Sequence, residues 1–256
     1  MTHPPAVVAA AAGAAATAEA AARYPERVFR QFLADSSWGA DRQWDTSATQ
    51  SGLVRSASED AGPRYPRFES YSFPTPPAHP SPAHRSRRVF GVQPSRDQVT
   101  ALLQSASGYA ASGYPVASAG AIRGFSVFVN VTGSPTTAAE LLHLDLRSHR
   151  VTPLWGTDSA GIETVFPGQP WIGMAPLCLF LVASVDSYED VYGSRGGRFA
   201  LMEAGSIATY ILHAASQFGL TGCFVGGFCD DAASNFLDLR TSEACLLAIV
   251  IGSEHD

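Results

Sequence analysis

Two stretches of the chain carry apolar residues at the spacing of an amphipathic helix. The first, residues 95–107, starts with Ser95 and Gln98, a pair that matches the capping box of a helix N-terminus. The second follows an Arg-Gly-Gly-Arg sequence and is predicted to end near Gly219. A shorter helix is expected over residues 230–239, capped by Asp230 or Asp231. The apolar positions are Val99, Leu102, Leu103 and Ala106 in the first helix, and Ile207, Ile211, Ala214, Ala215 and Phe218 in the second.

Other segments have the patterns of β-strands. Residues 124–132 (GFSVFVNVT) alternate apolar and polar positions, and residues 141–154 (LLHLDLRSHRVTPL) read as two short strands joined through a polar turn. Residues 176–184 and 245–253 are continuous apolar runs of strand length, which is typical of central strands covered on both faces. With the predicted helices as cover, the pattern predicts an α+β protein with a mixed or antiparallel sheet.

The first third of the chain has a different character. Residues 6–22 are mostly alanine, and without a basic start they are interpreted as a helix-prone or disordered extension rather than a signal peptide. Residues 24–45 carry enough apolar side chains for a short helical arm that packs on something else. Residues 56–84 hold seven of the chain's 17 prolines, which favours a linker. The expected divisions are an extension and arm over 1–55, a linker over 56–83 and a folded domain over 84–256.

Composition excludes several function classes. With 256 residues and 46% hydrophobic content the chain can bury a full core, and its net charge of −6 argues against a general nucleic-acid binder. No apolar run reaches the roughly 20 residues of a membrane span, so a soluble protein is expected. The four cysteines form no C-x-x-C pair, which favours buried free thiols in a reducing, cytoplasmic compartment over disulfides or a metal site. All 17 basic residues are arginine, because the chain has no lysine.

Four short stretches are candidates for binding chemistry. Residues 84–90 (HRSRRVF) offer guanidinium groups for a phosphate, and residues 115–121 (PVASAGA) let a backbone approach a flat ligand. Residues 225–239 and 192–198 each place a glycine pair before a helix, where free amides suit an anion. A solvated basic patch and ordinary tight turns explain the same residues without a ligand. The usual dinucleotide and nucleoside-triphosphate signatures are absent.

The order of these stretches resembles the nitroreductase superfamily. The series comprises R-S-x-R-x-F from Arg85, S-A-G-A from Ser118, Y-G-x-R-G-x-R-x-A-L-x-E-A-G from Tyr192, and G-G-F-x-D-D from Gly226. It is most similar to the branch of SagB-type dehydrogenases, which form thiazoles and oxazoles in peptide natural products. The resemblance covers about residues 84–252, and RGGRFALMEAG is its most specific part.

The resemblance implies an FMN-dependent enzyme with a nitroreductase-like sheet, a homodimer that binds the flavin at the subunit interface. Arg85, Ser86 and Arg88 match the segment that holds the flavin phosphate and the polar edge of the ring. Ser118, Ala119 and Gly120 match a segment against the ring or ribityl chain, and Gly226 and Gly227 match a glycine pair near the phosphate. Arg195, Arg198 and Glu203 are expected in a substrate-side or interface wall, with pairing of the arginines to a carboxylate as the structural alternative.

The chain departs from the family pattern at the proposed catalytic base. The branch often has a Lys-Tyr pair that removes a proton while hydride goes to the flavin, but here the lysine is Val191 and only Tyr192 remains. A phenol with a pKa near 10 is a poor base unless a positive charge lowers its pKa, and Arg195 or Arg198 is the candidate neighbour. Glu203 or a histidine is the substitute if tyrosine does not act. His84 and Ser206 replace an arginine and a histidine of the family.

Three functions therefore remain open at the level of sequence. The first is dehydrogenation of a modified peptide substrate, azoline to azole or a related desaturation, alongside a peptide-modifying partner enzyme. The second is a generic NAD(P)H-dependent FMN reductase or nitroreductase. The third is a non-catalytic scaffold subunit that has lost the Lys-Tyr pair.

Overall fold

A computed structural model describes residues 29, 32, 33, 86–91, 93–106, 116–133, 138–146 and 150–253. All of them belong to one compact unit, formed by residues 1–42 and 86–256. The second unit, residues 43–85, lies outside the described residues, as do the predicted alanine-rich extension, the proline-rich linker and Arg85. Of the predicted arm, Phe29, Phe32 and Leu33 are helical, and Phe29 is buried.

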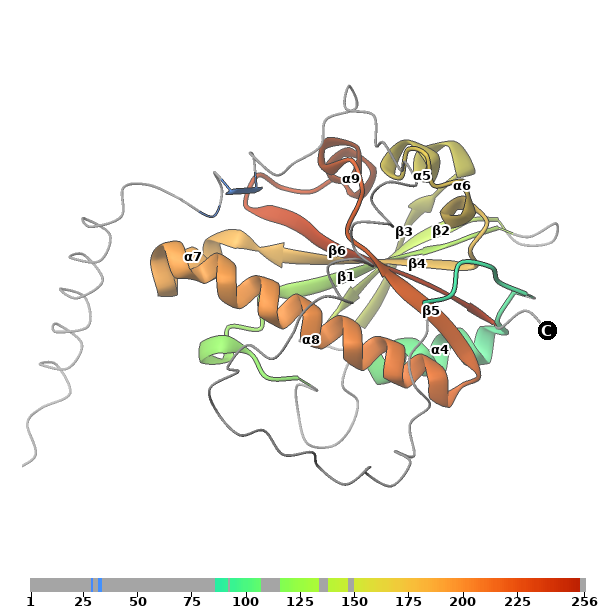
Figure 1. Ribbon diagram of the computed structural model, residues 1–256, viewed down its shortest axis with the longest axis horizontal. Coiled ribbons are helices and arrows are strands. Elements are labelled where there is room, and N and C mark those ends of the chain that lie inside the picture. The colour runs from blue at the N-terminus through green and yellow to red at the C-terminus, as the bar shows by residue number, and fades with distance from the viewer. Residues whose placement is uncertain are drawn as a thin grey trace, which may run out of the picture. The chain divides into compact units, whose positions relative to one another are not determined.

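Between residues 86 and 253, six strands and six α-helices make up the described fold (Figure 1). The strands are β1 (Phe125–Val131), β2 (Glu140–Asp145), β3 (Arg150–Gly156), β4 (Leu177–Ser184), β5 (Leu220–Val225) and β6 (Glu243–Ser253). The helices are α4 (Arg96–Ala106), α5 (Ser159–Val165), α6 (Pro170–Gly173), α7 (Val185–Tyr192), α8 (Gly196–Gln217) and α9 (Asp230–Leu237), with one-turn 3₁₀ helices η1 (Ala119–Ala121) and η2 (Gly193–Arg195).

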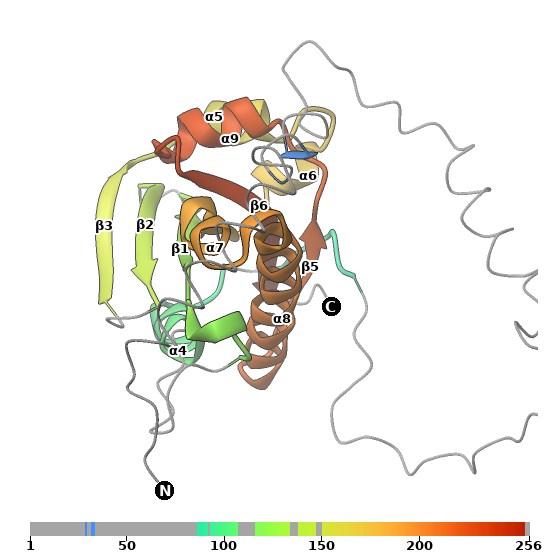
Figure 2. The same cartoon turned by 90° about the vertical axis from the view of Figure 1, so that its left-hand side faces the viewer.

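The strands form one sheet in the order β3-β2-β1-β4-β6-β5, and every neighbouring pair is antiparallel. Helices α4, α7 and α8 cover one face, while α5, α6 and α9 cover the other (Figure 2). Because both faces are covered, β4 is buried along almost its whole length. The predicted α+β fold with an antiparallel sheet flanked by helices is confirmed.

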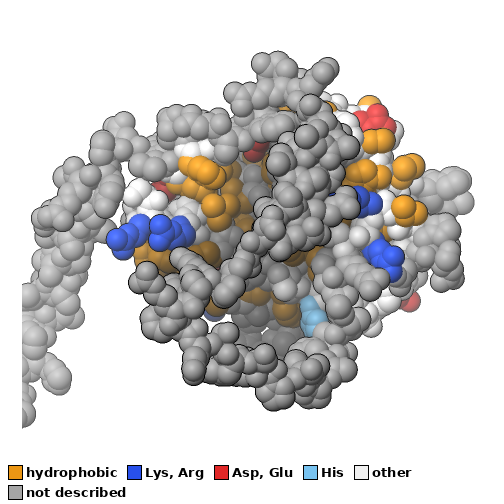
Figure 3. Space-filling model, viewed as in Figure 1, with side chains coloured by type: hydrophobic (Ala, Val, Ile, Leu, Met, Phe, Trp, Pro, Cys, Tyr) orange, Lys and Arg blue, Asp and Glu red, His pale blue; other side chains and the backbone are white. Residues whose placement is uncertain are grey.

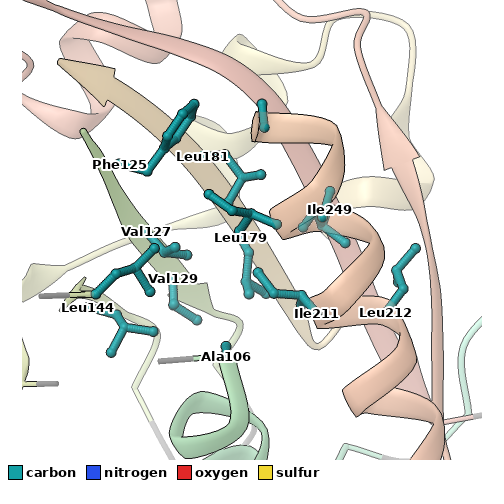
Figure 4. Close-up of a cluster of buried hydrophobic side chains, with 14 of the residues drawn as sticks. Ala106, Phe125, Val127, Val129, Leu144, Leu179, Leu181, Ile211, Leu212 and Ile249 are labelled. Carbon is teal, nitrogen blue, oxygen red and sulfur yellow. The ribbon is translucent and has the colours of Figure 1, made fainter. Parts of the chain in front are cut away.

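The face under α8 holds the larger hydrophobic cluster (Figure 4). Leu179 and Leu181 of β4 point toward Ile211 of α8, and Ile249 of β6 lies beside them. Four of the five apolar positions predicted for this helix, Ile207, Ile211, Ala214 and Ala215, are buried in α8, and the fifth, Phe218, is its half-buried C-cap residue. On the other face, Phe166, Phe180 and Phe228 pack as an aromatic group under α5 and α9. These two clusters fix the sheet that carries the candidate site.

The capping box at the start of α4 is confirmed in both of its hydrogen bonds. The backbone N–H of Ser95 donates to Oε1 of Gln98 at 2.9 Å, and the backbone N–H of Gln98 donates to Oγ of Ser95 at 3.2 Å. The side-chain amide (Nε2) of Gln98 also donates to the backbone carbonyl of Phe218 at 2.9 Å. The start of α4 is thereby tied to the end of α8.

The glycine pair before the long helix is not a flexible turn, contrary to the sequence interpretation. Gly196 and Gly197 are the first two residues of α8, and both are buried. A Cβ on Gly196 would stand 2.5 Å from the carbonyl oxygen of Tyr188, and one on Gly197 would overlap the ring of Phe29. The pair is therefore explained by close packing of α8 against α7 and the N-terminal arm, which any larger side chain would prevent.

The predicted cap of α9 is also wrong. Cys229 is the N-cap residue, with extended backbone angles and no side-chain cap, while Asp230 and Asp231 lie in the first turn. In that position their carboxylates complement the positive end of the helix dipole. No described helix is long and apolar enough to span a membrane.

Candidate functional site

The S-A-G segment folds into a strained loop directly before β1. Ser118 precedes the one-turn helix η1, and its hydroxyl accepts a hydrogen bond from the backbone N–H of Arg123 at 2.9 Å. Gly120, Ala121 and Arg123 all have positive φ angles, of 58°, 54° and 52°. Two of these three residues carry a Cβ, so the loop keeps a backbone conformation that non-glycine residues adopt rarely, a feature concentrated at functional sites.

Two tyrosines of α7 hold this loop. Tyr188 and Tyr192 are four residues apart and so share one face of the helix. The backbone N–H of Gly124 donates to the hydroxyl of Tyr188 at 3.4 Å. The hydroxyl oxygen of Tyr192 lies 2.6 Å from the position that a Cβ on Gly120 would occupy. The predicted base and the predicted ring-contact segment are therefore neighbours.

The surroundings of Tyr192 combine an aromatic contact with exposed positive charge. The ring of Tyr192 packs against that of Phe199 with centroids 4.6 Å apart. Arg195 and Arg198 are exposed, and neither forms an ion pair with any carboxylate that the structure describes. In Figure 3, basic side chains lie beside apolar ones at the end of the molecule where Figure 1 shows α7. Glu203 differs, because it is only 2% exposed and lies inside α8's packed face.

The arginine-rich segment before α4 runs along the edge of the sheet at β5. The backbone N–H of Arg87 donates to the carbonyl of Gly222 at 3.4 Å, and that of Gly91 donates to the carbonyl of Ser253 at 3.1 Å. Ser86 and Arg88 are exposed. The guanidinium carbon of Arg88 lies 5.8 Å from the ring centroid of Trp171 in α6, within cation–π range.

The second glycine pair meets the same helix α6. The side-chain amide of Gln169, the N-cap residue of α6, donates to the carbonyl oxygen of Gly227 at 2.6 Å. A Cβ on Gly226 would meet no atom within 4 Å, so open space lies in front of this backbone. Gln169 and Trp171 were not among the predicted site residues, since nothing in the local sequence links them to Arg88 or Gly227.

Cys223 of β5 is close enough to Arg88 for the two side chains to interact electrostatically. Burial raises the pKa of the Cys223 thiol, and the Arg88 guanidinium offsets part of that rise. The cluster thus contains a neutral thiol and a cation, and no described carboxylate pairs with Arg88. A guanidinium with no carboxylate partner in the described part of the chain, next to open backbone, fits an anionic ligand such as a phosphate.

The two groups of predicted site residues lie on opposite faces of the sheet. Trp171 packs with the cluster under α5, α6 and α9, while Phe199 packs with the cluster under α8. The S-A-G loop and the arginine segment also lie toward opposite ends of β6. The loop before β1 meets the end of β4 that pairs with Glu243, and the arginine segment reaches Ser253. In Figure 1 the green turn η1 and the teal segment 86–91 are accordingly far apart.

Sequence comparison decides the family. Residues 84–253, about two thirds of the chain, match the sequence model of the nitroreductase family. The protein belongs to the nitroreductase family. A protein of Methanocaldococcus jannaschii named as a nitroreductase is 31% identical over 81 residues, which cover 32% of this chain and 41% of that relative. The chain therefore matches less than half the length of this curated relative.

Solved structures share the nitroreductase fold at low sequence identity. One chain of the Escherichia coli microcin synthetase complex McbBCD, with truncated pro-MccB17 bound, superposes with a TM-score of 0.68 and 19% identity, over 90% of this chain and 92% of that one. A nitroreductase-like protein of Anabaena variabilis gives 0.57 and 21%, over 68% and 37% of the two chains. A similar protein of Ralstonia eutropha gives 0.54 and 21%, over 68% and 80%.

Proposed function

We propose that this nitroreductase-family protein is an FMN-dependent oxidoreductase that dehydrogenates a peptide-derived substrate, converting an azoline to an azole or performing a related desaturation. The observation that carries the proposal is the contact between Tyr192 and the S-A-G loop at Gly120. It joins a residue able to move a proton to the segment that the family resemblance assigns to the flavin ring.

The proposed binding of FMN is supported by the chemistry of the residues around Arg88 and Gly226. Arg88 supplies a guanidinium that no described carboxylate neutralises, and Gly226 offers backbone with open space before it. A phosphate dianion fits this donor set. Ser86 is exposed next to Arg88 and adds a hydroxyl. Bound FMN would supply the two-electron acceptor that takes a hydride from the substrate carbon.

The proposed role of the protein's own side chains in the reaction is to remove a proton from the substrate. Oxidation of an azoline removes a hydride and a proton from adjacent atoms, so a base must stand near the hydride acceptor. We assign this role to Tyr192, since its hydroxyl lies at the S-A-G loop and its ring is fixed by Phe199. Exposed Arg195 and Arg198 follow it in the chain and provide positive charge for an anionic part of the substrate.

The positions of the two groups support a homodimer. One flavin that contacts both Arg88 and the S-A-G loop within a single protomer would have to reach residues on both faces of the sheet. In a homodimer, the phosphate-binding residues of one protomer can lie beside the S-A-G loop of its partner, so that one flavin contacts both. The proposed site is therefore shared between subunits and incomplete in a monomer.

A peptide substrate is favoured by the extent of the structural match. The microcin synthetase chain covers 90% of this chain, whereas the nitroreductase structures from Anabaena and Ralstonia cover 68%. That synthetase complex has a truncated pro-peptide bound. We propose a comparable setting here, a cytoplasmic enzyme acting on a modified peptide with a peptide-modifying partner.

The test begins with the purified protein. A yellow protein that releases FMN on denaturation and elutes as a dimer is expected, and mixing it with an azoline-containing peptide should bleach the flavin under anaerobic conditions. Bleaching by NAD(P)H but not by such a peptide would favour a generic reductase. A colourless protein that FMN does not reconstitute would instead identify a non-catalytic scaffold subunit.

A further inference from the structure

Helix α6 and its N-cap residue contact both parts of the proposed phosphate-binding site, which are Arg88 and the Gly226–Gly227 pair. These two parts are far apart in the sequence. Trp171 presents its ring to the guanidinium of Arg88, with 5.8 Å between the guanidinium carbon and the ring centroid. Two residues earlier, the Gln169 amide donates to the carbonyl of Gly227 at 2.6 Å. The same short segment therefore contacts the arginine and the glycine pair at once.

This segment is itself firmly held. The backbone N–H of Gln169 donates to the carbonyl of Phe166 at 3.1 Å, and Ile172 of α6 is 1% exposed. The ring of Phe166 packs edge-on against that of Phe228, the residue after Gly227, with centroids 6.3 Å apart. The glycine pair is thus anchored on the α6 side through both Gln169 and Phe166. An element this well packed can impose its geometry on the groups it contacts.

The contact between Arg88 and Trp171 has a specific effect on an exposed arginine. A long side chain at the surface samples many rotamers, and fixing it on binding an anion costs conformational entropy. An aromatic face under the guanidinium restricts these rotamers beforehand, while the N–H groups at the guanidinium edge stay available for a phosphate. Hydrogen bonding of its carbonyl likewise fixes the orientation of the peptide at Gly227.

We propose that Trp171 and Gln169 are positioning residues for the phosphate of FMN, with Trp171 acting through Arg88 and Gln169 acting through the Gly226–Gly227 backbone. This inference rests on the proposed function. It adds α6 to the cofactor site and gives a reason for the cation–π contact of an exposed arginine at the sheet edge.

The experiment compares FMN with riboflavin, which has the same ring and ribityl chain but no phosphate. Trp171→Ala is expected to weaken FMN binding by about 2- to 30-fold, the range of a cation–π contact, and to leave riboflavin binding unchanged. Trp171→Phe should recover most of the FMN affinity. Gln169→Ala should also weaken FMN selectively. Met174→Ala is the matched control, because Met174 follows α6, is 75% exposed and should change neither affinity.

A double-mutant cycle checks that Trp171 acts through Arg88. In the Arg88→Ala background, Trp171→Ala should cause no further loss of FMN affinity. Additive losses, or equal losses of FMN and riboflavin, would overturn the inference, as would wild-type affinity in Trp171→Ala.

The double-mutant cycle of Arg88→Ala and Trp171→Ala is also measured on the thermal stability of the flavin-free protein. This measurement distinguishes a failure of the inference from a failure of the proposed function. A wild-type protein that binds neither flavin refutes the proposed function, and with it the phosphate role. The Arg88–Trp171 coupling is expected in the flavin-free protein in either case. Zero coupling there refutes the positioning of Arg88 by Trp171 even if FMN binds.

Discussion

The hydroxyl oxygen of Tyr192 lies against the α-carbon of Gly120, 2.6 Å from where a Cβ would stand. Gly120 also has a φ of 58°, which an L-residue adopts at a cost. Two independent restraints therefore demand glycine at this position. The same contact makes the S-A-G loop and the end of α7 a single packed unit, so a change in one residue is felt by the other.

Gly120→Ala should destabilise the protein by about 1–3 kcal/mol through its positive φ and its overlap with Tyr192. Gly219→Ala is the control, since Gly219 also has a positive φ, of 71°, but no atom within 4 Å of its Cβ position. Urea denaturation should show a larger loss for Gly120→Ala than for Gly219→Ala. Combining Gly120→Ala with Tyr192→Phe should restore part of the difference, and no restoration would mean that the two residues do not clash.

Tyr192→Phe should leave the fold and flavin binding intact, because the ring still packs on Phe199. Turnover of the peptide substrate should fall by something like 10²–10⁴, the range for loss of a general base. Steady-state assays of the two proteins, at matched flavin content, measure the ratio. Nearly equal rates would assign Tyr192 a packing role and move proton removal to another group, with buried Glu203 then the first residue to test.

Arg88→Ala should weaken FMN binding roughly tenfold to a hundredfold, as expected for one charge-assisted phosphate contact. Arg87→Ala should have a much smaller effect, because Arg87 contacts Gly222 through its backbone N–H, which alanine keeps. Fluorescence titration of FMN into the flavin-free variants gives both affinities. Equal losses at the two positions would show that the motif has been aligned in the wrong register.

The thiols of Cys178 and Cys245 should resist alkylation in the folded protein. Burial raises the pKa of both thiols, so they remain neutral at pH 7–8, and only the thiolate reacts readily. Mass spectrometry after iodoacetamide treatment should find these two cysteines unmodified in native protein and all four cysteines modified in denaturant. Rapid native labelling of either residue would contradict the buried placement.

The sequence patterns predicted the parts of the fold that are governed by local rules or by strong burial. The capping box of Ser95 and Gln98 predicted the start of α4, and the apolar runs predicted β4 and β6. All four cysteines are free and buried, as expected. By contrast, β5 and α7 were missed. Strand β5 contains Gly222, and α7 carries the polar sequence of Asp186, Ser187, Glu189 and Asp190, so neither has a clear periodic pattern.

The candidate site was only partly visible in the sequence, and for a physical reason. Motif order located the S-A-G segment and the glycine pair, but the meeting of Trp171 with Arg88 depends on how α6 packs beside β5. Likewise, Gly196 and Gly197 resemble a turn locally, and only the approach of α7 and Phe29 shows that they belong to a helix. Contacts between distant segments have no signal in a local window of sequence.

The position of β6 in the sheet has a consequence for how the protein folds. This strand is the last of the six in chain order, yet it lies between β4 and β5 and pairs with both. Until residues 243–253 are in place, β5 has no strand to pair with, and the inner edge of β4 exposes unpaired backbone groups. During synthesis, the half of the sheet built from β1 to β4 must therefore wait with an open hydrophobic edge, which makes the incomplete chain prone to association until β6 inserts.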